Sequence, residues 1–281
     1  MKTDIKKNKI ELTNRLFKCY IDYLRVDLSN FFRNDFDKGR NIDVIVSFRD
    51  IFGNILFFDC IGSLLLSNTK DDLDKLEVYT SRLLKKGRNL ADIKKENISL
   101  SCIEKIFSDD KGIMELTNLF GEILYAAKRF RESSVKPYME GFKQYCNGIQ
   151  YKGFVQSVLE VHNAFSHLAA FLYQGDPEDP FKNIDKAKSH LYRAILDYYK
   201  ILIRFSINKI KKKDVLTRSF YSIRKQEFLF LGQNLENKKI VFFNPENEHE
   251  EQENIMIAYK ILYETIEEIL EHQYPSSQTR H

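Results

Sequence analysis

Proline is absent from nearly the whole first half of the chain, since the first of its five prolines is Pro137. Glycine is also scarce, with 11 in 281 residues. Both residues interrupt helices, and a small β-sandwich or barrel needs such turn residues at short intervals. Their scarcity therefore argues against an all-β fold and predicts long, uninterrupted helices.

The composition is that of a globular protein with a buried core. Hydrophobic residues make up 43% of the chain and charged residues 30%, which distinguishes it from a disordered chain. No Pro-, Gly- or Ser-rich linker divides the sequence, so we expect one helical domain over residues 1–281. The fold class that we expect is predominantly all-α, a helical bundle with long antiparallel helices.

Apolar residues recur at three- and four-residue steps along most of the chain, which is typical of amphipathic helices. The predicted helices cover about 4–34, 70–86, 98–107, 112–133, 136–147, 151–174, 183–213 and 250–273.

Two segments bear on β-structure. Apolar residues alternate over 42–48, which fits a small β-hairpin near 42–60, but the spacing of Phe48, Ile51, Phe52 and Ile55 also fits a helix, which we prefer. A short strand is predicted over 239–243, before an acidic loop at 246–253.

The helices predicted over 151–174 and 183–213 form an αα-hairpin. Gly175, Pro177 and Pro180 mark the turn between them, and Asn183 is placed to cap the second helix. A turn this short makes the helices antiparallel neighbours. The predicted core positions of the first helix are Val155, Val158, Leu159, Phe165, Leu168, Ala169 and Leu172.

Polar residues lie beside the core positions of both helices. They are Glu160, His162, Asn163, Ser166 and His167 on the first, and His190, Arg193 and Asp197 on the second. Imidazole transfers protons near neutral pH, and guanidinium stabilises negative charge, so such a cluster can cleave a phosphodiester without a metal. The alternative is a hydrogen-bonded network that fixes the register of the two helices and catalyses nothing.

The segments 160–168 and 186–200 resemble proteins of the HEPN superfamily. These are helical, usually dimeric proteins, and many are metal-independent endoribonucleases with an Arg-polar-x4–6-His motif. His167 corresponds to the motif histidine and Asn163 to the polar residue. His162 stands where the family has arginine, and a histidine carries positive charge only part of the time at neutral pH.

This resemblance implies a HEPN-like core at about 112–213, preceded by a helical extension at about 1–111 and followed by a C-terminal helix at about 250–273. It implies an RNA-binding protein or metal-independent endoribonuclease of a bacterial antiviral defence or toxin–antitoxin system. The catalytic candidates are His167, His162, Asn163 and Arg193, the last as a replacement for the motif arginine. Loss of that arginine favours the alternative, a catalytically inactive scaffold or partner-binding subunit of a defence complex.

A basic stretch follows the second of these helices. Its candidate RNA-binding residues are Lys209, Lys211, Lys212, Lys213 and Arg218, and it continues through Phe220, Tyr221, Arg224 and Lys225. Lysine and arginine contact phosphates while aromatic rings stack on bases. The alternative is a solvated, lysine-rich surface. A further interpretation is that the acidic segment 246–253 docks on the basic stretch and masks it. A second basic stretch holds Lys128, Arg129, Arg131 and Lys136.

Several classes of site have no sequence support. The four cysteines form no CxxC pair, and the chain contains no HExxH or glycine-rich phosphate loop, so we expect neither metal nor cofactor. The charged N-terminus does not resemble a signal peptide, and the most apolar stretch, 51–66, is too short to span a bilayer. We expect a cytoplasmic protein that does not bind a membrane. Its expected protein partner is a second copy of the chain or another protein of a defence complex, and its expected nucleic-acid partner is RNA.

Overall fold

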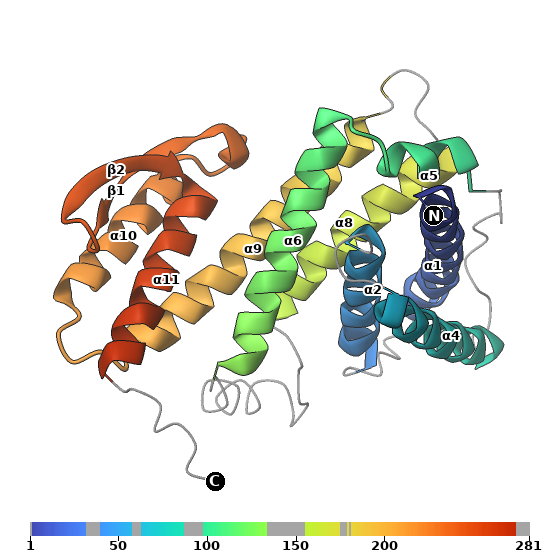
Figure 1. Ribbon diagram of the computed structural model, residues 1–281, viewed down its shortest axis with the longest axis horizontal. Coiled ribbons are helices and arrows are strands. Elements are labelled where there is room, and N and C mark those ends of the chain that lie inside the picture. The colour runs from blue at the N-terminus through green and yellow to red at the C-terminus, as the bar shows by residue number, and fades with distance from the viewer. Residues whose placement is uncertain are drawn as a thin grey trace, which may run out of the picture.

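The computed structural model describes residues 2–31, 40–57, 63–86, 98–133, 155–174, 179 and 181–273. The fold is predominantly helical, as predicted (Figure 1). Its helices are α1 (Lys2–Phe31), α2 (Arg40–Leu56), α4 (Ser63–Lys86), α5 (Leu100–Ile106), α6 (Lys111–Glu132), α8 (Val155–Gln174), α9 (Lys182–Ile207), α10 (Asp214–Leu229) and α11 (Ile255–Gln273). A 3-10 turn, η1 (Leu235–Asn237), precedes the strands β1 (Lys239–Asn244) and β2 (His249–Asn254).

Helix α9 runs through the middle of the molecule and packs against α6, α8 and α11 (Figure 1). It is buried on more than one face, since Leu191 and Ile203 are 0% exposed and Leu196 is 1% exposed, although Leu196 and Ile203 lie more than about 100° round the helix from Leu191. A helix that is apolar over so much of its circumference must be covered by several neighbours. Helices α1, α2, α4 and α5 lie toward one end of α9, and α10, α11 and the hairpin toward the other (Figure 1).

An aromatic cluster joins the N-terminal helices to α8. Phe17 of α1 stacks on Phe165 of α8 with ring centroids 5.7 Å apart, and Phe52 of α2 meets both rings edge-on. Tyr20 and Phe48 extend the cluster. All five side chains are fully buried, so their apolar area stabilises this junction.

The alternative of a β-hairpin near 42–60 is wrong for the described residues, because 40–56 forms α2. Phe48, Ile51, Phe52 and Ile55 are all buried, and their helical spacing places them on one side, against α1 and α8. Burial of that face outweighs the strand-like alternation at the start of the segment.

The small antiparallel hairpin instead pairs β1 with β2, in the register Val241 opposite Gln252. The strand predicted over 239–243 is confirmed. The prediction of a loop over the acidic segment 246–253 is wrong, because most of this segment forms β2. The last helix accordingly begins at Ile255 rather than at 250. Ile240 and Phe242 are buried, whereas the glutamates of β2 remain accessible to water, so pairing costs them little solvation.

The helix predicted over 183–213 is shorter than expected. It ends at Ile207, and a separate helix, α10, begins at Asp214, because the lysines at 211–213 offer no apolar side chain to pack. Asn183 does not cap α9; instead Asp179 Oδ1 accepts hydrogen bonds from the backbone N–H of Phe181 and Lys182.

One core position predicted for the first helix of the αα-hairpin is wrong. Leu159, predicted in the core, is instead 46% exposed. The predicted helix over 136–147 lies outside the described residues, as do Gly175, Pro177 and Pro180 at the predicted turn.

A buried arginine links α2, α6 and α9. Arg49, 2% exposed, donates to the Tyr198 hydroxyl at 3.0 Å and to Asp50 Oδ1 at 2.7 and 2.9 Å. Arg131 of α6 binds the other oxygen of Asp50 at 3.1 Å. The guanidinium of Arg49 is thus compensated by partners from two helices, as a buried charge requires.

We predict that Arg49→Met lowers the free energy of unfolding by about 3 kcal/mol, because it leaves the buried Tyr198 hydroxyl without its charged partner. Urea denaturation at neutral pH measures the change. Arg131→Met is the matched control, since Arg131 binds the same aspartate but is 44% exposed, and it should cost less than about 1 kcal/mol. Equal losses in the two variants would contradict the assignment.

Candidate functional site between α8 and α9

The centre of the polar cluster is the Glu160 carboxylate of α8, which is 13% exposed. Its Oε2 lies 2.6 Å from His190 Nδ1 and 3.3 Å from Arg193 Nε, both on α9. His190 and Arg193 are three residues apart and so lie on the same face of α9. Antiparallel packing of the two helices brings that face to Glu160.

The contacts of His190 restrict its tautomer. Arg193 Nη2 also lies 2.7 Å from His190 Nδ1, but a guanidinium only donates, and Nδ1 carries either a hydrogen or a lone pair. A carboxylate accepts hydrogen bonds, so Nδ1–H donates to Glu160, and Arg193 contributes its charge alongside. The Nε2 atom of His190 is then available to exchange a proton with a ligand.

A second imidazole lies against the first. The rings of His167 and His190 are nearly parallel, with centroids 5.2 Å apart and an interplanar angle of 22°. His167 Nδ1 is 3.3 Å from Asn183 Oδ1 of α9, which fixes the orientation of the ring. Burial lowers the pKa of His167; the Asn183 contact opposes this shift, and positive charge on His190, Lys186 and Arg193 adds to it. His167 is therefore predominantly neutral at neutral pH.

His162 and Asn163, the other motif residues, do not join this cluster. His162 turns toward α1, where its Nδ1 lies 3.0 Å from the Tyr20 hydroxyl and its ring meets Tyr20 and Tyr23 edge-on. Tyr20 also donates to the His162 carbonyl at 2.9 Å. The five-residue step from 162 to 167 places the two histidines on different sides of α8. Asn163 is exposed.

Of the four predicted catalytic residues, the structure thus brings His167 and Arg193 into one cluster and places His162 and Asn163 elsewhere. It adds Glu160, His190 and Asn183 as direct members. Helical spacing places Glu160 on the same face as His167, and His190 on the same face as Arg193. It gives no reason to prefer Glu160 and His190 as catalytic candidates over the motif residues His162 and Asn163. Asn183 was interpreted as a helix cap.

This arrangement supplies two imidazoles, an orienting carboxylate and a partly exposed guanidinium. Two imidazoles in contact can act as acid and base on one substrate, and Arg193, 45% exposed, can neutralise an anion beside them. In the part of the chain that the structure describes, no group of three or more His, Cys, Asp or Glu residues could hold a metal ion.

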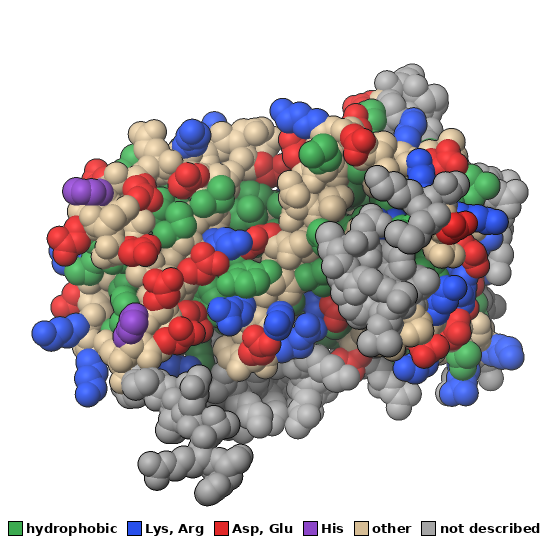
Figure 2. Space-filling view, in the orientation of Figure 1, with side chains coloured by type: hydrophobic (Ala, Val, Ile, Leu, Met, Phe, Trp, Pro, Cys, Tyr) green, Lys and Arg blue, Asp and Glu red, His purple; other side chains and the backbone are tan. Residues whose placement is uncertain are grey.

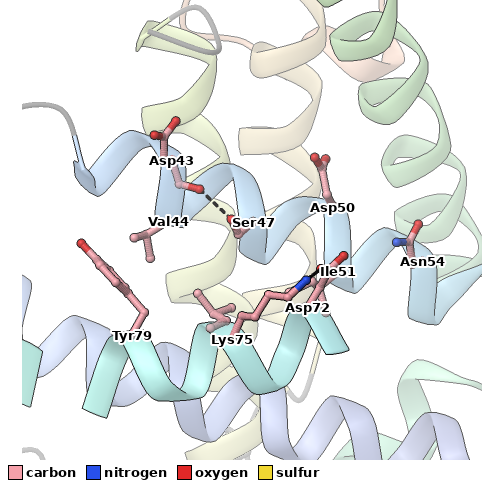
Figure 3. A pocket seen from close by; sticks show the side chains of 10 residues that line it. Asp43, Val44, Ser47, Asp50, Ile51, Asn54, Asp72, Lys75 and Tyr79 are labelled. Atoms are coloured by element: carbon pink, nitrogen blue, oxygen red, sulfur yellow. Dashed lines mark hydrogen bonds and ion pairs between the residues drawn. The ribbon is translucent and has the colours of Figure 1, made fainter. Parts of the chain in front are cut away.

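A separate groove of about 450 Å³ lies between α2 and α4 (Figure 3). Asp43, Ser47 and Asp50 line its α2 side, and Asp72 and Lys75 its α4 side. Asp50 is bound by Arg49 and Arg131, and Asp72 pairs with Lys75 at 3.0 Å. These charges are already compensated within the protein, and the groove contains none of the histidines.

The candidate RNA-binding residues after α9 differ in their contacts within the protein. Lys209 lies over the Phe205 ring at 4.2 Å, and Lys213 donates to Asn208. Lys211, Lys212 and Arg218 are exposed and, among the described residues, have no ion-pair partner. Phe220 is 6% exposed and packs on Tyr259, so it cannot stack on a base.

The second basic stretch has a structural role within the described residues. Arg131 binds Asp50, and Arg129 lies over the Tyr125 ring at 5.6 Å. Lys136 lies outside the described residues. On the face shown in Figure 2, acidic and basic side chains are interspersed, so no large field of one sign covers it.

Comparisons with protein-family models, curated proteins and solved structures each returned no match. Among the described residues, no helix is long and apolar enough to cross a membrane.

We predict that His167 makes the stability of the protein pH-dependent. Its pKa in the folded state lies below the ordinary value of 6.5, so the unfolded chain binds the proton more tightly. Its contribution is complete above pH 6.5 and declines as the pH falls from 6.5 toward the folded pKa. Urea denaturation between about pH 5.5 and 7.5 should therefore show a shallower decline in His167→Asn than in the wild type. Identical slopes would refute this.

Proposed function

We propose that the protein is a metal-independent endoribonuclease whose reaction centre is the cluster between α8 and α9. The observation that carries the proposal is the pair of stacked histidines, His167 and His190, with Glu160 and Arg193 bound to the second. A neutral imidazole beside a second imidazole that a carboxylate orients can act as base and acid in concerted catalysis.

In the reaction, neutral His167 takes the proton from an RNA 2′-hydroxyl, and the 2′-oxygen attacks the adjacent phosphorus. Protonated His190, oriented by Glu160, gives its proton to the departing 5′-oxygen as the P–O5′ bond breaks. The products are a 2′,3′-cyclic phosphate and a free 5′-hydroxyl. Arg193 stabilises the extra negative charge on the phosphoryl oxygens during the transfer.

The sequence supports RNA as the substrate in two ways. The resemblance to HEPN proteins implies RNA and, with it, a homodimer or partner protein in a cytoplasmic bacterial defence or toxin–antitoxin system. The exposed Lys211, Lys212 and Arg218 add cations without ion-pair partners among the described residues, which suits a phosphate backbone.

We predict that His167→Ala and His190→Ala each lower the rate of RNA cleavage by about 10²- to 10⁴-fold, the usual contribution of a general acid or base. Cleavage of a fluorescent single-stranded RNA in excess EDTA provides the measurement. The wild type should leave a 2′,3′-cyclic phosphate, and replacing the 2′-hydroxyl at the scissile position with hydrogen should block the reaction.

His162→Gln is the matched control for this experiment. It removes an imidazole from the same helix but on the side that faces Tyr20, so it should reduce stability more than the rate of cleavage by the folded fraction. The proposal fails if the wild type does not cleave RNA, or if the His190 and His162 variants lose the same activity.

A second candidate function is the inactive scaffold, and the position of His162 favours it. The residue that replaces the motif arginine lies against Tyr20 and Tyr23, so the motif itself stabilises the junction of α8 with α1. In this case the Glu160 cluster only fixes the register of α8 against α9.

The scaffold candidate predicts a different outcome for the charge-removing variant Arg193→Gln. Because Arg193 is 45% exposed, the variant should show weaker self-association or partner binding in sedimentation velocity. The wild type should show no RNA cleavage. An unchanged association state together with measurable wild-type cleavage would exclude the scaffold.

A further inference from the structure

The solvent-facing side of α10 carries an uncommon combination of side chains. Arg218, Tyr221, Lys225 and Phe228 follow one another at steps of three, four and three residues, so they form one stripe along the helix. We call these four residues the α10 ribbon. Tyr221 is 66% exposed and Phe228 68%, and both cations are exposed as well.

The opposite side of α10 explains why the ribbon is free. Leu216, Phe220, Ile223 and Glu227 are buried, and the last accepts hydrogen bonds from Tyr259 at 2.6 Å and Lys200 at 3.2 Å. These contacts fix α10 against α9 and α11. The four ribbon side chains therefore lie on the side of α10 that faces away from α9 and α11.

The acidic strand lies on another side of α10. The Gln226 side chain binds both backbone groups of Val241, with Val241 N–H donating to Oε1 at 2.9 Å. Gln226 thus occupies the outer edge of β1, and β2 pairs with the other edge. The glutamates of β2 are separated from α10 by β1. Helix α10 itself carries two acidic residues: Asp214 lies at its start, and Glu227 is buried and bound by Lys200, Arg224 and Tyr259.

We propose that the α10 ribbon binds single-stranded RNA, with bases stacked on Tyr221 and Phe228 and phosphates bound by Arg218 and Lys225. Two rings seven residues apart lie about 10 Å apart along the helix axis, with Lys225 between them and Arg218 three residues before Tyr221. Neither Arg218 nor Lys225 has an ion-pair partner among the described residues, so both charges are available to an anion. Alternating cations and aromatic rings are the elements that bind single strands without sequence preference.

The arrangement favours RNA over a membrane surface or an apolar protein partner. Lys225 lies between Tyr221 and Phe228 on the same stripe, so inserting the two rings into lipid would also bury its ammonium group. Protein interfaces are depleted in lysine at their centres for the same reason. A nucleic acid instead offers planar bases and phosphates side by side.

The ribbon takes its ligand class from the proposed function, and it adds a binding site for the RNA outside the reaction centre. Of the two aromatic residues predicted in this basic region, Tyr221 is exposed and Phe220 is buried, and the structure adds Phe228.

Fluorescence anisotropy with a 2′-O-methyl RNA of about 12 nucleotides tests the ribbon. This probe lacks the 2′-hydroxyl, so binding is measured apart from cleavage. Tyr221→Leu/Phe228→Leu keeps the apolar character and removes the rings, and it should weaken binding by about 30-fold or more. Retention of wild-type affinity in this variant, or no binding by the wild type, overturns the proposal.

Salt dependence tests the cations separately. Arg218→Gln/Lys225→Gln should lower the slope of log affinity against log salt by about 1.4, since each phosphate contact on a single strand contributes about 0.7. Arg82→Gln/Lys85→Gln, on the exposed side of α4, removes the same charge and should leave the slope unchanged. Equal effects of the two pairs would mean that only net charge matters and would overturn the ribbon.

Two further outcomes separate the alternatives. Sedimentation with vesicles of phosphatidylcholine and phosphatidylserine identifies a membrane face, and vesicle binding retained by the leucine variant without RNA binding would refute the proposal. If the ribbon variants lose RNA binding while His190→Ala leaves cleavage unchanged, the reaction centre is refuted and the ribbon is supported.

Discussion

The structure depends on the burial of α9. Its side chains are covered by α6, α8 and α11, so the three helices cannot move relative to one another without exposing apolar surface. Helix α8 is held in turn by the aromatic cluster of Phe17, Phe52 and Phe165. The polar contacts between α8 and α9 are therefore set by a rigid apolar frame rather than by their own strength.

Two buried charges inside this frame each have more than one partner. Arg49 binds Asp50 and Tyr198, and Glu227 binds Lys200, Arg224 and Tyr259. Burial raises the pKa of Glu227, but Lys200, Tyr259 and Arg224 together outweigh it and lower that pKa. The Glu160 cluster differs, because Arg193 is 45% exposed and a ligand can compete for it.

The site was only partly predictable from the sequence. Helical spacing put His167 with Glu160, and His190 with Arg193, and the antiparallel pair brought these faces together as expected. The motif resemblance drew attention to His162 and Asn163, but the packing of α1 turns His162 toward Tyr20. A residue's place in a motif specifies its position along the helix, whereas the neighbouring helix determines what its side chain contacts.

The sequence by itself determined the predominance of helices, the strand at 239–243 and the pairing of α8 with α9, because breaker residues and apolar periodicity are local properties. Only the tertiary structure decided that the first part of 42–60 is helical and that the acidic segment forms a strand. It also decided that Tyr221 faces water while Phe220 faces the core. These outcomes depend on which surface each segment buries, and that surface comes from residues far away in the chain.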